Sequence, residues 1–141
     1  MNKDTITISN DIWEQLAARA AEAYPFEGCG VLLGNGDDYR IRKIRELKNS
    51  VSREAAESFF SIDPLSIYEL EDEEKDYEII GFYHTHPEHK AVPSKEDEKY
   101  MIPGMIYMII SVTGGFCSDL RLYHRQKADG EILEIRIGEA A

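Results

Sequence analysis

The chain has 141 residues, 43% of them hydrophobic and 30% charged, and its formal net charge at pH 7 is −11. These proportions are typical of a soluble globular protein, and the length suffices for one domain with its own core. A chain this acidic offers no obvious groove for nucleic acid, which is bound by basic surfaces. We therefore expect a single domain over residues 1–141 and partners other than nucleic acid.

The cysteines and the apolar runs indicate the compartment. Cys29 and Cys117 are the two cysteines, too few for a disulfide framework or a cysteine-based zinc site. The first residues lack the apolar core of a signal peptide. The longest apolar run, at 105–112, is far too short to span a bilayer. We expect a cytoplasmic protein without membrane contact, in which Cys29 is a buried, inert thiol.

Patterns in the first third of the chain predict a strand, a helix and a hairpin. Ile6 and Ile8 alternate with polar residues, and apolar residues then recur at spacings of three and four after a cap at Ser9 or Asn10. The run that begins at Cys29 is apolar throughout, so we expect a strand buried on both faces. The predicted elements are a strand at 5–9, a helix at 10–23, a strand at 29–33, a turn at 34–38 and a strand at 39–47.

The remainder of the chain predicts further strands and two more helices. Residues 49–56 are polar and predict a connecting loop, with a mobile flap as the alternative. The acidic run at 71–74 is interpreted as a solvated helix end, with a docking patch as the alternative, and its position at a helix C-terminus hints at a shorter helix. The predicted elements are strands at 58–62, 105–112, 120–125 and 132–137 and helices at 64–75 and 95–101, the first of these helices capped by Asp63 with Pro64 at its first position.

Two histidines stand at the end of an apolar run. Side chains at alternate positions of a strand share a face, so His84 and His86 point the same way if this run is a strand that ends at Pro87. Two imidazoles on one face can share a metal ion, and a catalytic zinc site generally takes a third protein ligand. Asp97 is the nearest suitable donor. Ser94 and Asp97 also have the spacing of a capping box, which would place Asp97 in the first turn of a helix near the strand end.

These residues carry a resemblance to a known family. His84-Thr85-His86, then seven residues, then Ser94-x-x-Asp97 resembles the signature of the JAMM (MPN+) zinc metalloprotease family. The segment 25–34, which contains Glu27, resembles the glutamate-bearing segment of prokaryotic members, and 60–64 is a weaker third match. The resemblance spans about residues 25–112. It implies an α/β fold in which a mixed, curved β-sheet is flanked by helices, similar to the cytidine-deaminase-like folds.

The resemblance also implies a role for each matching residue. His84, His86 and Asp97 would hold one Zn²⁺ per chain, and Glu27 would be the general base and acid. Ser94 would donate a hydrogen bond to the tetrahedral oxyanion, and the sequence leaves open whether capping or this role dominates. Tyr83 faces away from the histidines by the strand period and is expected in the core.

The implied function is a zinc-dependent isopeptidase or peptidase. Prokaryotic members are implied to hydrolyse amide bonds at the C-terminus of ubiquitin-like or sulfur-carrier proteins with a metal-activated water. The alternative is a non-catalytic scaffold or binding module of the same fold, which in this family lacks one or more of the five positions that are all present here. A zinc nucleobase deaminase is disfavoured because no Pro-Cys-x-x-Cys follows the histidines.

Overall fold

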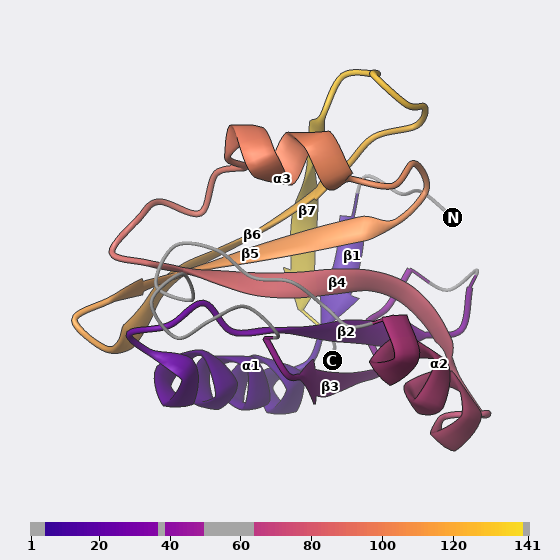
Figure 1. Ribbon diagram of the computed structural model, residues 1–141, viewed down its shortest axis with the longest axis horizontal. Helices are drawn as coiled ribbons and strands as arrows, with labels where there is room; N and C mark the ends of the chain where they lie inside the picture. The colour runs from indigo at the N-terminus through magenta and orange to yellow at the C-terminus, as the bar shows by residue number, and fades with distance from the viewer. Residues whose placement is uncertain (1–4, 37–38, 50–63, 140–141) are drawn as a thin grey trace.

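A mixed β-sheet curls through the part of the chain that the computed structural model describes, which comprises residues 5–36, 39–49 and 64–139 (Figure 1). The sheet has seven strands in the order β1-β7-β6-β5-β4-β2-β3. The strands are β1 (Thr5–Ile8), β2 (Cys29–Gly34), β3 (Lys43–Leu47), β4 (Glu78–Pro87), β5 (Ile106–Thr113), β6 (Phe116–His124) and β7 (Leu133–Glu139). The helices are α1 (Asn10–Ala23), α2 (Pro64–Glu73) and α3 (Lys95–Tyr100).

The pairing of β4 makes the sheet mixed. β4 runs antiparallel to β2 on one side and parallel to β5 on the other, and the parallel pairing continues to Pro87. The remaining neighbours pair antiparallel except for β1 and β7, which are parallel. Because β4 has neighbours on both sides, its side chains have fixed directions, and its C-terminal end is a rigid support.

The two ends of the strand order approach each other through residues 39–42. Thr7 N donates to Tyr39 O and Ile41 N donates to Thr7 O, both at 3.0 Å, and Arg42 N donates to Leu33 O at 2.8 Å. Residues 39–42 therefore connect β1 to β2, and this connection brings the two ends of the sheet together and curls it. The expected strand at 39–47 is therefore too long, because Tyr39 has a φ of 50° and only Lys43–Leu47 pairs with β2.

α1 and α2 lie on opposite faces of the sheet. α1 begins at the N-cap Ser9, whose Oγ accepts from Ile12 N at 3.3 Å, and it packs its buried residues on the face that includes Tyr83 and Ile110. Phe82, the neighbour of Tyr83 on β4, packs instead with the cluster that contains Leu70 of α2. Consecutive strand residues point to opposite faces, so α1 and α2 cover different sides. The predicted fold class, a mixed curved sheet flanked by helices, is confirmed.

Tyr83 belongs to the core, as predicted. Its side chain is buried, and its ring lies where a side chain on the paired Gly30 would be, since a Cβ there would lie 2.2 Å from Tyr83 Cε2. The hydroxyl of Tyr83 is buried without a hydrogen-bond partner in the described structure. A buried polar group that has lost its bonds to water without replacement destabilises the folded state.

We predict that Tyr83→Phe raises the free energy of unfolding by about 1 kcal/mol, because it removes the unpaired buried hydroxyl and keeps the ring. Urea unfolding of the variant and the wild type measures the difference. A loss of stability of similar size would show that the hydroxyl has a partner.

α2 is shorter than predicted. It ends at Glu73 rather than near Lys75, and Glu74 is not solvated, since only 9% of it is exposed. Glu74 accepts hydrogen bonds from Lys43 Nζ at 2.9 Å and Arg45 Nη1 at 3.0 Å, which join the residue directly after α2 to β3. The interpretation of the acidic run as a purely solvated helix end was therefore wrong for this residue. The hydrogen bond from Lys43, with that from Arg45, holds the pKa of Glu74 below its ordinary value.

We predict that Glu74→Gln lowers the free energy of unfolding at pH 7 by about 1 kcal/mol, since both cationic partners are partly exposed. A carboxyl whose pKa is lowered by folding stabilises the protein above its unfolded-state pKa, and this contribution disappears as the pH falls through the folded-state pKa. The variant and the wild type should therefore converge below a pH of about 4. Urea unfolding at neutral and acidic pH tests this, with Glu71→Gln, a change at an exposed residue, as the control. A difference that persists undiminished in acid would contradict the ion pair.

The C-terminal strands agree with the prediction in kind and differ in length. β6 begins at Phe116, directly after a turn in which Gly114 and Gly115 have positive φ of 58° and 89°, so it is longer than predicted.

Some predictions lie outside the described residues: the strand at 58–62, most of the loop at 49–56, the Asp63 cap and part of the turn at 34–38. No helix in the described ranges is both long enough and apolar enough to cross a membrane. The assignment of residues 1–141 to a single domain stays a prediction.

Candidate metal centre

The end of β4 carries two histidines on one face of the sheet. His84 is 3% exposed and His86 is 9% exposed. In the sheet His84 lies between Cys29 of β2 and Ile109 of β5. The two Nε2 atoms are 3.1 Å apart and the ring centroids 4.9 Å apart. The strand period thus places both imidazoles where they can meet a third group.

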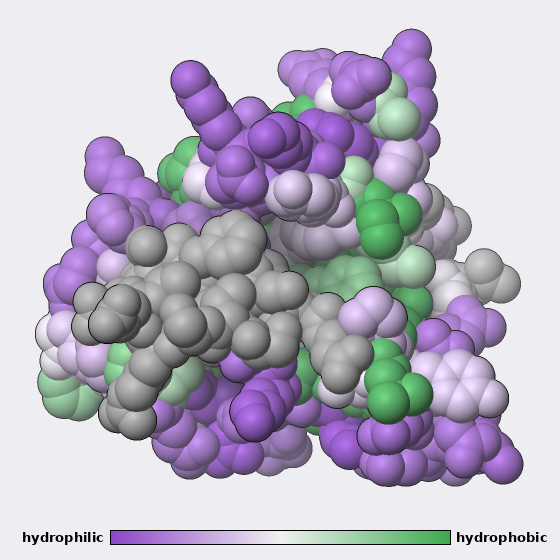
Figure 2. All heavy atoms as spheres, viewed as in Figure 1, coloured by the Kyte–Doolittle hydropathy of each residue, from purple (hydrophilic) through white to green (hydrophobic). Residues whose placement is uncertain are grey.

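The first turn of α3 supplies that group. Asp97 Oδ1 lies 3.1 Å from His84 Nε2, and Asp97 Oδ2 lies 3.1 Å from His86 Nε2. A capping box holds this turn: Asp97 N donates to Ser94 Oγ at 3.0 Å, and Ser94 N donates to Asp97 Oδ2 at 2.8 Å. The cap that the sequence predicts is present, and it directs the Asp97 carboxylate toward the histidines. Figure 2 shows that the outer surface over α3 is mainly hydrophilic.

Glu27 reaches the same place from the connection between α1 and β2. Its side chain is buried, with 7% exposed. One of its carboxylate oxygens and one ring nitrogen each of His84 and His86 all lie within 4.8 Å of one another. A glutamate far upstream in the sequence is therefore adjacent to the histidine pair.

Hydrogen bonding fixes the form of one imidazole. The carbonyl oxygen of Lys90 lies 2.9 Å from His86 Nδ1, and because a carbonyl can only accept, this nitrogen carries the proton. His86 Nε2 faces Asp97 Oδ2 at 3.1 Å: with a proton it donates to this carboxylate, and without one it presents a lone pair that a metal ion can bind. The backbone carbonyl of Lys90 thus orients the His86 ring through the nitrogen that faces away from Asp97.

The donor set fits a zinc ion. Two lone-pair atoms 3.1 Å apart repel each other unless a proton or a cation lies between them. Ligands at about 2.0–2.1 Å from a tetrahedral zinc are separated from one another by about 3.3–3.4 Å. The spacing among the two imidazole nitrogens and the carboxylate oxygens is close to this value. Their chemistry, imidazole nitrogen and carboxylate oxygen, also suits zinc.

Burial and charge give the three acid–base groups different pKa values. Burial lowers the pKa of His84, so the imidazole is neutral and can act as a ligand. Burial alone would raise the pKa of Asp97, but hydrogen bonds from His84 and His86 outweigh it and hold this pKa well below its usual range. Burial raises the pKa of Glu27 to about 7, and the nearby His86 opposes the rise only in part.

The structure brings together all five residues that the sequence singled out: Glu27, His84, His86, Ser94 and Asp97. Their roles as ligands, base and oxyanion donor stay predictions. Sequence reasoning missed Thr85 and Asn49, whose side chains bond the backbone beside Glu27. The alternation of the strand showed only that Thr85 faces away from the histidines.

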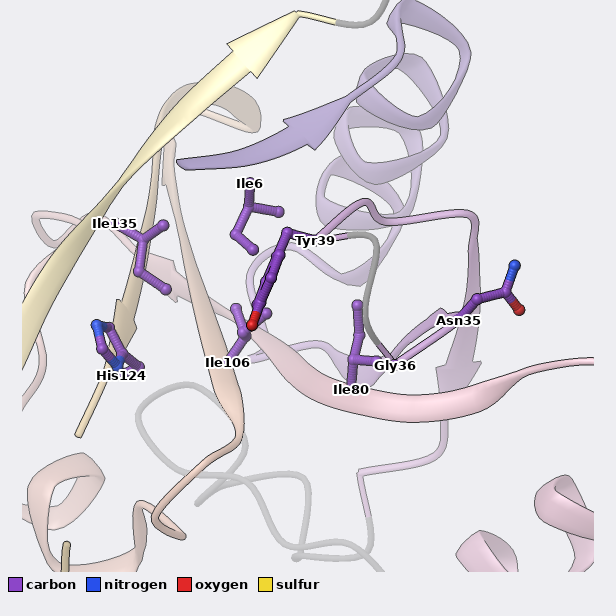
Figure 3. A pocket seen from close by; sticks show the side chains of 8 residues that line it. All are labelled: Ile6, Asn35, Gly36, Tyr39, Ile80, Ile106, His124 and Ile135. Carbon is purple, nitrogen blue, oxygen red and sulfur yellow. The ribbon is translucent and has the colours of Figure 1, made fainter. Parts of the chain in front are cut away.

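A hollow lies apart from this centre (Figure 3). Its lining is largely apolar and includes none of the five residues. The lining residues are Ile6, Asn35, Gly36, Tyr39, Ile80, Ile106, His124 and Ile135.

The curled sheet and its helices define a protein with the JAB/MPN fold. A JAB1/MPN domain protein from Archaeoglobus fulgidus has a similar structure, with a TM-score of 0.61 at 20% identity, covering 95% of this chain and 98% of that chain. The solution structure of a Desulfitobacterium hafniense protein is also similar, with a TM-score of 0.78 at 28% identity, covering 96% of this chain and 92% of that chain.

Sequence comparison gives the family. Residues 9–123 match the model of the prokaryotic homologs of the JAB domain, and the chain belongs to this family. The desampylase of Haloferax volcanii is 30% identical over 122 residues, which cover 81% of this chain and 86% of the relative. The resemblance that the motif indicated is therefore confirmed at the level of the family.

We predict that the protein binds one Zn²⁺ per chain and that Asp97→Ala loses it, because this carboxylate contacts both histidines. Elemental analysis after dialysis measures the stoichiometry, and a chelator should lower the Tm of the wild type. Glu98→Ala, in the same turn but exposed, is the control and should keep the metal. A full zinc complement in Asp97→Ala would contradict this assignment.

Proposed function

We propose that this protein is a zinc-dependent metallopeptidase that hydrolyses amide bonds at the C-terminus of ubiquitin-like or sulfur-carrier proteins. The observation that supports it most is the convergence of a buried glutamate, two histidines and an aspartate at one strand end. When bound, zinc supplies an acidified water and a positive charge that polarises the carbonyl.

Distances and pKa values divide the carboxylates into two roles. Asp97 lies 3.1 Å from both imidazoles and stays ionised, so it suits a permanent ligand together with His84 and His86. A carboxylate oxygen of Glu27 lies within 4.8 Å of a ring nitrogen of each histidine, and the pKa of Glu27 is raised to about 7. A carboxyl with a pKa near the working pH can both accept and return a proton. Glu27 therefore takes the proton of the attacking water and delivers it to the leaving amine nitrogen.

Ser94 can serve as cap and as donor at the same time. The cap uses a lone pair of its Oγ, which accepts from Asp97 N. A hydroxyl has one proton to donate as well, and Ser94 is exposed, so this proton can reach a substrate. A preorganised donor to the oxyanion of a tetrahedral intermediate contributes about 3 kcal/mol to catalysis.

The substrate class rests on the relatives. The resemblance to prokaryotic JAMM proteins and the presence of a desampylase among the relatives both support a small carrier protein as substrate. The scissile bond would follow the C-terminal tail of that carrier, which would lie extended beside the metal centre.

The direct test uses zinc-loaded protein and ubiquitin-like or sulfur-carrier proteins fused at the C-terminus to a short peptide. Mass analysis of the products should show a single cut directly after the last residue of the carrier. Protein that holds a full complement of zinc but cuts none of these fusions would support the scaffold alternative instead.

We predict that Glu27→Gln keeps about one zinc per chain and lowers kcat by about 100- to 10,000-fold, since the amide cannot take a proton from water. Zinc analysis and turnover of the same carrier fusion give the two values. Glu14→Gln, at an exposed position of α1, is the matched control. Undiminished turnover in Glu27→Gln would remove Glu27 from the mechanism.

A further inference from the structure

The peptide bond after Glu27 is held on both sides. Glu27 lies in a connection without regular structure, between α1 and β2. Its carbonyl oxygen accepts a hydrogen bond from Asn49 Nδ2 at 2.9 Å. The N–H of Gly28, in the same peptide plane, donates to Thr85 Oγ1 at 2.8 Å. Two side chains from different parts of the chain therefore bind the two polar groups of one amide plane.

Thr85 connects this plane to the strand that carries the histidines. Its backbone N–H also donates to Gly28 O at 2.9 Å, so Thr85 binds Gly28 twice. Thr85 is 1% exposed and lies between His84 and His86, with its side chain on the opposite face. One run of three residues thus directs the imidazoles on one face and fixes the backbone beside Glu27 on the other.

Close packing leaves the loop little freedom to shift. A Cβ added at Gly28 would lie 2.7 Å from the Cβ of Ala23 at the end of α1. The methyl group of Thr85 would lie 3.9 Å from the same point. The residue at 28 is therefore enclosed by α1 and β4, and the Thr85 hydroxyl provides the acceptor for its N–H. A valine at position 85 would fill a similar volume and remove the acceptor of this partly buried N–H.

We propose that Thr85 and Asn49 are positioning residues that aim the Glu27 carboxyl at the histidine pair, an inference that rests on the proposed function. Fixing both groups of the peptide plane fixes the Cα of Glu27, which lies in that plane, and so limits the region that its side chain can reach. Proton transfer requires the carboxyl within hydrogen-bond reach of the water. A displacement of about 1 Å at a reacting group can cost about 100-fold in rate.

The test compares four variants of the full chain. Thr85→Val removes the hydroxyl, Thr85→Ser keeps it, and Asn49→Ala removes the other hydrogen bond. Thr7→Val makes the same chemical change on β1, away from the centre, and is the control. Three quantities are measured: hydrogen exchange of the Gly28 amide by NMR, zinc content, and kcat and KM with a carrier fusion.

We expect Thr85→Val to speed exchange of the Gly28 amide at least about 10-fold and to lower kcat about 10- to 100-fold. Zinc content should stay at one per chain and KM within about 3-fold of the wild type, because the ligands and the substrate surface are untouched. Thr85→Ser should restore both exchange and kcat. Asn49→Ala, at a half-buried position, should lower kcat about 10-fold, and it tests the proposal by itself if Thr85→Val does not fold.

The outcomes separate this proposal from the function it rests on. If the wild type is active and Asn49→Ala and Thr85→Val have the same kcat as the wild type, the positioning role is overturned and the hydrolase function stands. Loss of zinc in Thr85→Val would also overturn it, since the residue would then support the ligands rather than Glu27. A zinc-loaded wild type that cuts no fusion would overturn the proposed function, and with it the positioning role in hydrolysis.

Discussion

The double pairing of β4 is the constraint on which the centre depends. β4 is bonded to β2 on one side and to β5 on the other, and this ladder reaches Pro87 on the β5 side. A strand held in this way cannot rotate, so its two histidines stay on one face with their Nε2 atoms 3.1 Å apart. These nitrogens and the nearby Asp97 oxygens have the separations expected of ligands around one metal ion, which supports a metal site at this strand end.

The other groups of the centre reach β4 through short local structures. The capping box at Ser94 orients the first turn of α3, so that one carboxylate both starts a helix and faces the imidazoles. On the opposite face, Thr85 holds the backbone beside Glu27. The centre thus needs no long rigid helix of its own, because its parts are fixed by hydrogen bonds to a strand that the core already holds.

Local patterns predicted the parts of the site that are near in sequence. The alternation of His84 and His86 and the cap spacing of Asp97 follow from strand and helix periods, which act over a few residues. Glu27 was different, because no local pattern distinguishes it from the other glutamates. Its approach to the histidines depends on the pairing of β2 with β4, and only the resemblance to a family pointed to it. Thr85 and Asn49 were missed for the same reason, since their partners lie on other segments.

The errors in the fold also come from contacts between distant segments. The strand predicted from Tyr39 is shortened because Tyr39 and Ile41 bond to Thr7 of β1. Glu74 was placed in solvent because nothing in the acidic run shows that Lys43 and Arg45 of β3 lie opposite it. In both cases the residue types agree with the local pattern, and a tertiary partner changes the outcome.

The same bonds of residues 39–42 have a consequence for the behaviour of the protein in concentrated solution. A terminal strand with free N–H and C=O groups is a template on which another molecule can add a strand, a common start of aggregation. Here Thr7 of β1 donates to and accepts from this segment. The edge of β1 is therefore protected at Thr7 by backbone hydrogen bonds to residues 39–41, rather than by charged side chains.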